Sequence, residues 1–170
     1  MAEAYVKESE LDWIIMRLSE VYGITEEEGV DFLINHIKQM PIVPIIGNGE
    51  YSISPVHVSD VISAIIKVID KAEIKNKVYN IVGPENFTYN GFIERISGLY
   101  KVRKIKVHIP TSFVWILLKI YFMISRSYYP AIDQLPRLFS DKLYDLSEAS
   151  RDLDFKPLSL ENFISKDGRV

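Results

Sequence analysis

Short apolar runs that end in turns alternate along this chain with stretches of helical periodicity, and this alternation constrains the fold most. Three such runs are short enough to form strands: residues 12–16, 42–46 and 77–82. The helical pattern is clearest at residues 60–71. The residues of its expected buried face are Val61, Ala64, Ile65, Val68 and Ile69. Strands that alternate with helices predict an α/β fold that contains parallel strands.

The same criteria predict the other elements. Extended segments are expected at residues 51–58 and 104–109, and helices at 1–9, 30–38, 89–99, 132–135 and from 147 and 160 onward. Ser59 and Thr88 each precede a helical stretch and are expected to cap it. No internal repeat or Gly/Ser linker divides the sequence, so residues 1–170 are expected to form a single portion of a fold.

Composition excludes several classes of function. The chain has 170 residues, no cysteine and a net charge of -3, so disulfides, thiol catalysis and a general affinity for nucleic acid are not expected. The three histidines are scattered, and no metal site is predicted. The charged N-terminus lacks the apolar core of a signal peptide, which favours a cytoplasmic protein.

Residues 113–124 are apolar almost all round a helix. The segment is shorter than the roughly 20 residues that a membrane span requires, and Lys119 interrupts it, so no transmembrane span is expected. A helix that is apolar on every face is usually buried or lies at an interface. We therefore expect this helix to cover a pocket or to support self-association, with Trp115 and Phe122 inside the contact.

Four short motifs occur in a fixed order. They are R-L-S-E-V-Y-G at 17–23, I-G-N-G at 46–49, P-V-H-V-S-D-V at 55–61 and V-Y-N-I-V-G at 78–83. Their order and spacing resemble the C-terminal half of extended and atypical short-chain dehydrogenases, the NAD-dependent epimerase/dehydratase family. The resemblance implies the C-terminal portion of a Rossmann-like fold with a small mixed α/β substrate-binding part. It also implies a nucleotide-binding half upstream of Met1, absent from this chain.

The resemblance assigns site residues through the first and third motifs. Leu18, Ser19 and Val21 would contact the nicotinamide end of NAD or NADP, largely through their backbone. Leu18 stands where family members usually carry proline. Tyr22 and His57 would lie on the side of a small-molecule substrate. Arg17 is interpreted instead as one half of a buried structural ion pair.

No catalytic residue is assigned. The chain lacks the glycine fingerprint that holds a dinucleotide pyrophosphate. Tyr100 and Lys104 have the Tyr-x-x-x-Lys spacing, but a predicted helix ends between them, so they would not share a helical face. His57 and Asp60 are interpreted as a strand-end histidine and a helix-start carboxylate. The resemblance implies that catalysis comes from a tyrosine and a lysine upstream of this chain.

Two departures concern the substrate. Nucleotide-sugar epimerases usually place an arginine just before the third motif, and residues 51–54 contain none. The pattern at residues 54–58, 133–135 and 155–160 is closer to the atypical branch that includes complex I accessory-subunit-like proteins. Besides the interpretation as one part of a larger enzyme, two alternatives stay open. The first is a non-catalytic assembly module that docks a protein or lipid through residues 113–124. The second is a small enzyme that uses Tyr100 and Lys104.

Overall fold

The computed structural model describes residues 2–25, 29–125 and 145–166. The chain divides into two compact units. Unit 1 contains Met1–Phe32, Ser54–Asn86 and Tyr144–Val170, and unit 2 contains Leu33–Ile53 and Phe87–Leu143. Each unit therefore joins segments that lie far apart in the sequence.

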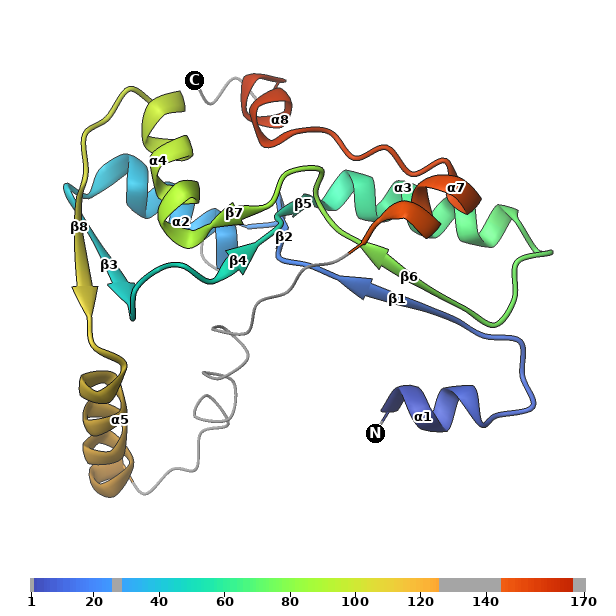
Figure 1. The fold of residues 1–170 in the computed structure, drawn as a ribbon, viewed down its shortest axis with the longest axis horizontal. Coiled ribbons are helices and arrows are strands. Elements are labelled where there is room, and N and C mark those ends of the chain that lie inside the picture. The colour runs from blue at the N-terminus through green and yellow to red at the C-terminus, as the bar shows by residue number, and fades with distance from the viewer. Residues whose placement is uncertain (1, 26–28, 126–144, 167–170) are drawn as a thin grey trace. The chain divides into compact units, whose positions relative to one another are not determined.

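Unit 1 is built around a parallel pair of strands joined by a helix (Figure 1). Its elements are α1 (Ala2–Lys7), β1 (Ile14–Leu18), β2 (Val21–Tyr22), the first turn of α2 (Gly29–Gln39), β5 (Val56–His57), α3 (Val58–Asp70), β6 (Lys77–Ile81), α7 (Ser147–Leu153) and α8 (Leu160–Lys166). Strands β1 and β6 pair in parallel, with Ile14 opposite Lys77 and Leu18 opposite Ile81. Strands β2 and β5 form a second short parallel pair.

The core of unit 1 lies between this sheet and helices α3 and α7. Its buried members are Val56, Val61, Ala64, Tyr79, Ile81, Ala149, Leu153 and Phe155. Ile14 and Met16 pack against the same cluster from β1, so the core extends across both strands. The Tyr79 hydroxyl donates a hydrogen bond to Asp152 over 3.0 Å. Burial and this carboxylate raise the pKa of Tyr79 to about 12, so the phenol stays protonated.

Unit 2 contains the rest of α2 together with β3 (Ile42–Ile46), β4 (Ser52–Ile53), β7 (Phe87–Thr88), α4 (Tyr89–Leu99), β8 (Ile105–Ile109) and α5 (Thr111–Ser125). Strands β3 and β8 pair in parallel, and β4 and β7 pair in antiparallel fashion. The side chains buried in its core include Ile37, Val43, Ile45, Phe92, Ile93 and Ile96.

The expected strands and helices within the described residues are confirmed, except that α3 begins at Val58, inside the segment expected to be extended, and two further details are corrected. Thr88 caps α4, as predicted, but the cap of α3 is His57 and not Ser59. The His57 imidazole accepts the backbone N–H of Ser59, which displaces the serine into the first turn. Ile65 and Ile69 are 41% and 71% exposed, so the buried face of α3 is narrower than the sequence pattern suggested. The helix expected at 132–135 and the acidic run at 26–28 lie outside the described residues.

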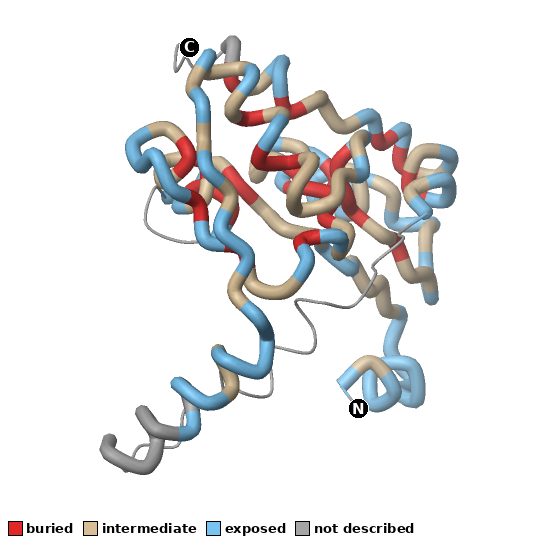
Figure 2. The backbone as a smooth tube through the Cα atoms, turned by 60° about the vertical axis from the view of Figure 1, so that its left-hand side comes forward, coloured by how far each residue is buried: buried red, intermediate tan, exposed pale blue. Residues whose placement is uncertain are grey.

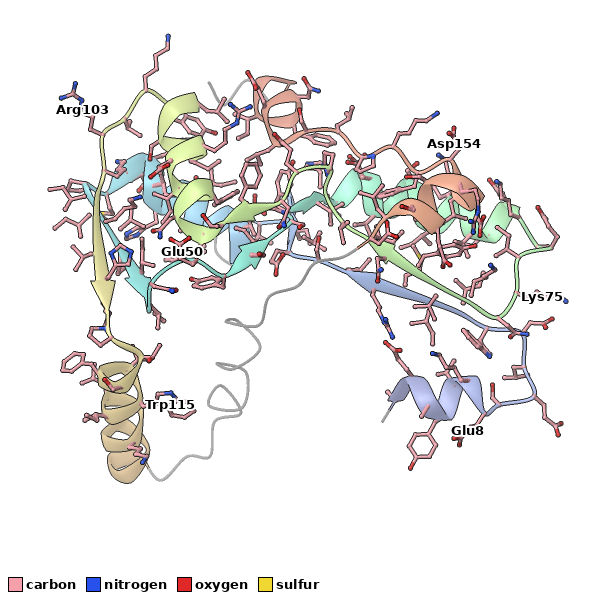
Figure 3. All side chains as sticks on the ribbon, viewed as in Figure 1. Glu8, Glu50, Lys75, Arg103, Trp115 and Asp154 are labelled. Carbon is pink, nitrogen blue, oxygen red and sulfur yellow. The ribbon has the colours of Figure 1, made fainter. Side chains whose placement is uncertain are left out.

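Helix α5 is largely exposed to solvent, and so are most of the residues whose burial the structure describes in it (Figure 2). Phe113, Ile116 and Leu117 are each about half exposed. Trp115 projects from α5 and is partly buried (Figure 3), whereas the Phe122 side chain lies outside what the structure describes. Within the described ranges, no helix combines the length and the apolar character needed to cross a membrane.

Candidate cofactor and substrate site

Three loops meet at one edge of the unit 1 sheet, where parallel strands β1 and β6 both end. After β1, the backbone N–H of Ser19 donates to the carbonyl of Ile81 over 3.2 Å. The Ser19 hydroxyl donates to the carbonyl of Ser54, just before β5. The carboxylate of Glu20 accepts the backbone N–H of Ser54 over 3.3 Å. The carboxyl edge of a parallel sheet is where α/β proteins bind ligands, so these contacts mark the candidate site.

Gly83 sits at the tightest crossing of these loops. Its backbone N–H donates to the carbonyl of Ser54 over 3.1 Å. A Cβ atom at this position would lie 1.9 Å from the carbonyl oxygen of Pro55. Only glycine fits, because the obstacle is backbone and cannot rotate away.

Three rings stack beside the loops. His57 and Phe163 are nearly parallel, with ring centroids 3.8 Å apart, and Tyr22 meets His57 edge-on at 5.1 Å. Phe163 comes from α8, so the C-terminal helix forms one wall of this cluster. Tyr22 is 4% exposed, which makes it the most buried residue predicted for the site.

The electrostatic surroundings keep the Tyr22 phenol neutral. Burial raises the pKa of Tyr22 well above its ordinary value, and the carboxylates of Asp60, Glu85 and Asp31 raise it further. A phenol in this setting can donate a hydrogen bond but is a poor proton acceptor. The assignment of Tyr22 to the substrate stays a prediction.

His57 is held in one orientation by its role at the helix start. Its Nδ1 atom accepts the backbone N–H of Ser59 over 3.1 Å and lies 2.7 Å from the Ser59 hydroxyl. In a neutral imidazole this arrangement puts the proton on Nε2. The Nε2 atom faces Gly23, where an added Cβ would lie 2.3 Å away.

Asp31 fixes the turn that follows Tyr22. Its carboxylate is 5% exposed and accepts the backbone N–H groups of Gly23 and Ile24 over 2.7 and 3.2 Å. Gly23 has φ +89°, a value that favours glycine. The first turn of α2 thereby holds the loop that carries the predicted contacts.

Two further carboxylates tie the C-terminal segment to the site. Asp60, in the first turn of α3, accepts the backbone N–H of Leu158 over 3.1 Å. Glu85 accepts the backbone N–H of Leu160 over 3.2 Å. Asp60 lies at the start of α3, as predicted, and it also has a structural partner in the C-terminal segment.

The residues predicted to contact the cofactor have different surroundings. Leu18 is 44% exposed at the end of β1, Ser19 is held by its bond to Ser54, and the side chain of Val21 packs on the core of unit 1. Only the backbone of Val21 is therefore available to contact a ligand. Arg17 does form the expected ion pair, with Glu3 at 2.6 Å, but the pair is exposed and not buried. These assignments to a cofactor stay predictions.

Sequence reasoning missed Gly83, Asp31 and Phe163. Asp31 carried a signal, because it is a charged residue early in an apolar helical run. No sequence pattern pairs Phe163 with His57, since more than a hundred residues separate them. Among the described side chains, no three histidine or acidic groups gather to hold a metal ion.

Tyr100 and Lys104 lie outside this site, in unit 2. Tyr100 follows the last residue of α4, and the Lys104 ammonium donates to the carbonyls of Lys38 and Met40 over 3.4 and 2.8 Å. The pair does not share a helix, as predicted.

We expect Tyr100→Phe to leave the fold and any activity unchanged, because the lysine is committed elsewhere. The free energy of unfolding should change by no more than about 1 kcal/mol, as measured by urea denaturation. A large loss of turnover with an unchanged fold would restore Tyr100 as a catalytic candidate.

Comparison with known proteins finds one family match and a shared fold. Residues 1–82 match the model of the NAD dependent epimerase/dehydratase family. The match includes the loop after β1 and strands β5 and β6, which build most of the candidate site. No curated protein matches the chain.

Solved structures share the epimerase/dehydratase-like fold. UDP-glucose 4-epimerase from Thermotoga maritima superposes with a TM-score of 0.66 at 23% identity, over 94% of this chain and 46% of its own. UDP-glucuronic acid 4-epimerase from Bacillus cereus gives 0.66 at 18% identity, over 96% and 46%. The dTDP-glucose 4,6-dehydratase DesIV from Streptomyces venezuelae gives 0.66 at 18%, over 99% and 46%. The α/β Rossmann-like fold is thereby confirmed, and the chain spans less than half the length of these proteins.

Proposed function

We propose that this chain is the substrate-side portion of an NAD(P)-dependent epimerase/dehydratase or reductase of the short-chain dehydrogenase class, and that it is inactive alone. The observation that carries the proposal is the joined set of loops at the carboxyl ends of β1 and β6. The loops after β1 and before β5 lie inside the segment that matches the family model, and the loop after β6 begins where that segment ends. The solved structures with this fold include complexes with NAD.

The residues of this chain suit one end of such a cofactor only. Leu18 is partly exposed at the carboxyl end of β1, and the Ser19 hydroxyl oxygen beside it can still accept a hydrogen bond, which fits the nicotinamide end. A pyrophosphate needs free N–H groups at a helix N-terminus, beside glycines. His57 occupies that position in α3, and Thr88 occupies it in α4. The pyrophosphate is therefore assigned to the half of the protein that lies upstream of this chain.

Tyr22 and His57 are proposed to face the substrate. Tyr22 would donate a hydrogen bond from its neutral phenol, and His57 would shape the wall of the site while it caps α3. When bound, the nicotinamide supplies hydride transfer. The proton transfer that accompanies it is assigned to the upstream tyrosine and lysine.

The substrate is proposed to differ from a nucleotide sugar. The epimerase from Thermotoga maritima was solved with UDP-glucose, and that from Bacillus cereus with UDP-glucuronic acid. Residues 51–54 of this chain contain no arginine to bind a diphosphate. This departure supports a place in the atypical branch that includes complex I accessory-subunit-like proteins.

The genomic DNA immediately upstream of Met1 gives the first test. We expect a reading frame that encodes a strand followed by G-x-x-G-x-x-G. A protein extended by that frame should exchange hydride with NAD(P), whereas the 170-residue chain should not turn over. Turnover by the short chain alone would contradict the proposal.

A second candidate function, assembly through α5, is favoured by the exposure of Phe113, Ile116 and Leu117. An isolated apolar helix face of this kind fits a protein or lipid surface. NAD(P)H binding separates the two functions, because an assembly module has no need of the cofactor even in its extended form.

A further inference from the structure

The two units of this chain carry opposite charge. Unit 2 holds ten of the 20 lysine and arginine residues but four of the 23 acidic residues, which gives it a formal charge of +6. Unit 1 holds the other ten bases and 19 acids, a formal charge of -9. The net charge of -3 is therefore the sum of an acidic unit and a basic unit. An asymmetry of this size within one chain favours an anionic partner for unit 2.

The positive charge of unit 2 reaches its surface. Three of its cations are exposed: Lys101, Arg103 and Lys119. Arg103 points away from the fold in Figure 3. The two acids that the structure describes in unit 2 already have partners, since Glu94 pairs with Lys106 at 2.6 Å and Glu50 accepts a hydrogen bond from Asn90 over 2.8 Å.

Unit 2 also exposes one apolar face of its β3–β8 sheet. Four apolar residues share this face, and they pair across the two strands as Ile42 with Ile105 and Pro44 with Val107. The alternate residues of β3 are fully buried in the core, so these four belong to the opposite face. Ile105 is 64% exposed, and Ile42 and Val107 are 49% and 43% exposed.

Helix α5 adds a second exposed apolar surface to the same unit. It begins two residues after the end of β8 (Figure 1). Phe113, Ile116 and Leu117 are each about half exposed, and their spacing of three and one puts them on one side of the helix. So much apolar surface in water indicates a binding surface.

These surfaces belong to unit 2, whose segments begin at Leu33. The upstream half proposed above would join the chain in unit 1 instead, at Met1. The start of the sequence therefore does not by itself explain why unit 2 is open, and the extended protein is included in the test below.

We propose that an anionic lipid bilayer occupies the exposed apolar surface of unit 2. The Phe113 side of α5 lies in the zone between headgroups and acyl chains, and the exposed cations of unit 2 meet anionic headgroups. This is attachment to one bilayer surface and not a span, which agrees with the length of the described helices. The inference goes beyond the proposed enzyme, because attachment requires no cofactor, and it selects one of the two partners considered for α5.

A bilayer fits both properties of unit 2. Its interface takes up apolar and aromatic side chains without requiring a matched shape, and its anionic headgroups attract nearby lysine and arginine. A twofold contact between two copies through this surface would instead bring two basic units together, and like charges across a contact oppose association. Charge thus favours lipid over a second copy.

Flotation of the 170-residue chain with lipid vesicles tests the proposal. Vesicles of phosphatidylcholine with about one third phosphatidylserine should bind the chain at least about tenfold more tightly than phosphatidylcholine alone. Raising the salt from about 0.1 to about 1 M shortens the Debye length from about 10 to about 3 Å and should remove most of this preference. A chain that binds neither kind of vesicle would overturn the proposal.

Substitutions on α5 test the apolar contribution. Ile116→Glu with Leu117→Glu should weaken vesicle binding at least about tenfold with an unchanged circular dichroism spectrum, because both side chains are already half exposed. Ile62→Glu with Ile66→Glu is the matched control, since these residues of α3 in unit 1 are exposed to the same degree, 51% and 52%. The control should bind like the unmodified chain, and equal losses in the two variants would count against unit 2 as the attached surface.

Charge reversal tests the electrostatic contribution. Lys101→Glu with Arg103→Glu should lower binding to phosphatidylserine vesicles to the level seen with phosphatidylcholine. Lys75→Glu with Lys156→Glu makes the same change of net charge at exposed positions of unit 1 and should leave binding nearly unchanged. An equal effect of both pairs would refute the specific attraction of unit 2.

Tryptophan quenching gives a readout that does not depend on the glutamate variants folding. The chain has two tryptophans, Trp13 in unit 1 and Trp115 on α5. In Trp13→Phe, vesicles with brominated acyl chains should quench Trp115. In Trp115→Phe, the remaining Trp13 should not be quenched. The reverse pattern would put the bilayer against unit 1 and overturn the proposal.

The protein extended by the upstream reading frame should bind the same vesicles, with or without NADH. Loss of vesicle binding on extension would overturn the proposal, because the upstream half would then cover this surface. The failure of vesicle binding would leave the proposed enzyme intact, since hydride exchange is measured without lipid. A chain that self-associates in place of binding vesicles, and that the α5 variant makes monomeric, would overturn the proposal in favour of a protein partner.

Discussion

Gly83→Ala is expected to abolish the folded state of unit 1 or to lower its free energy of unfolding by about 3 kcal/mol or more. The new Cβ would lie 1.9 Å from the carbonyl oxygen and 2.8 Å from the carbonyl carbon of Pro55. Both atoms are backbone, so the loop after β6 has to move away from the segment before β5. That movement also breaks the 3.1 Å hydrogen bond from Gly83 to Ser54.

Gly98→Ala is the matched control for this change. Gly98 lies within α4, and no atom approaches its added Cβ within 4 Å. Alanine should therefore be neutral or stabilise the protein by up to about 1 kcal/mol. Urea unfolding followed by circular dichroism measures both variants. Equal stability of the two variants would contradict the close approach of Gly83 to the Pro55 backbone.

Asp31→Ala is expected to cost about 2 kcal/mol of stability, because two backbone N–H groups lose a charged acceptor. Gly23 and Ile24 both donate to this carboxylate, and the Gly23 turn follows directly after Tyr22. The loop should therefore also become more mobile. Hydrogen exchange at Gly23 should accelerate by at least tenfold.

Asp70→Ala is the corresponding control, since Asp70 is an exposed acid at the end of α3. Its removal should change stability by less than about 0.5 kcal/mol. If Asp31→Ala proved as mild as Asp70→Ala, the α2 carboxylate would not be what holds the turn.

Elements whose signals are local were predictable from the sequence. The apolar run at residues 42–46 and the threonine at position 88 each act through neighbouring residues, and both are confirmed as β3 and as the cap of α4. Parallel pairing also followed from the alternation of strands and helices. The exposure of Ile65 and Ile69 could not be predicted, because helical periodicity identifies an apolar side without showing whether a partner covers it.

The candidate site was predictable only where its sequence signals are local. The motifs at 17–23 and 55–61 identified the loops that hydrogen bonds later join, and Ser19 and Ser54 are in contact. The stack of Phe163 on His57 depends on where the C-terminal helix returns, which no local pattern encodes. His57 caps α3 because its imidazole nitrogen accepts the backbone N–H two residues on, a role that a serine, threonine or aspartate oxygen usually takes.

Titration of NADH fluorescence tests the central claim most directly. The 170-residue chain should bind NADH no tighter than about millimolar, because no glycine loop in its sequence supplies the pyrophosphate contacts. The protein extended by the upstream reading frame should bind at micromolar concentration. Micromolar binding by the short chain, or no binding by the extended protein, would contradict the account of this chain as the substrate-side portion of a dinucleotide enzyme.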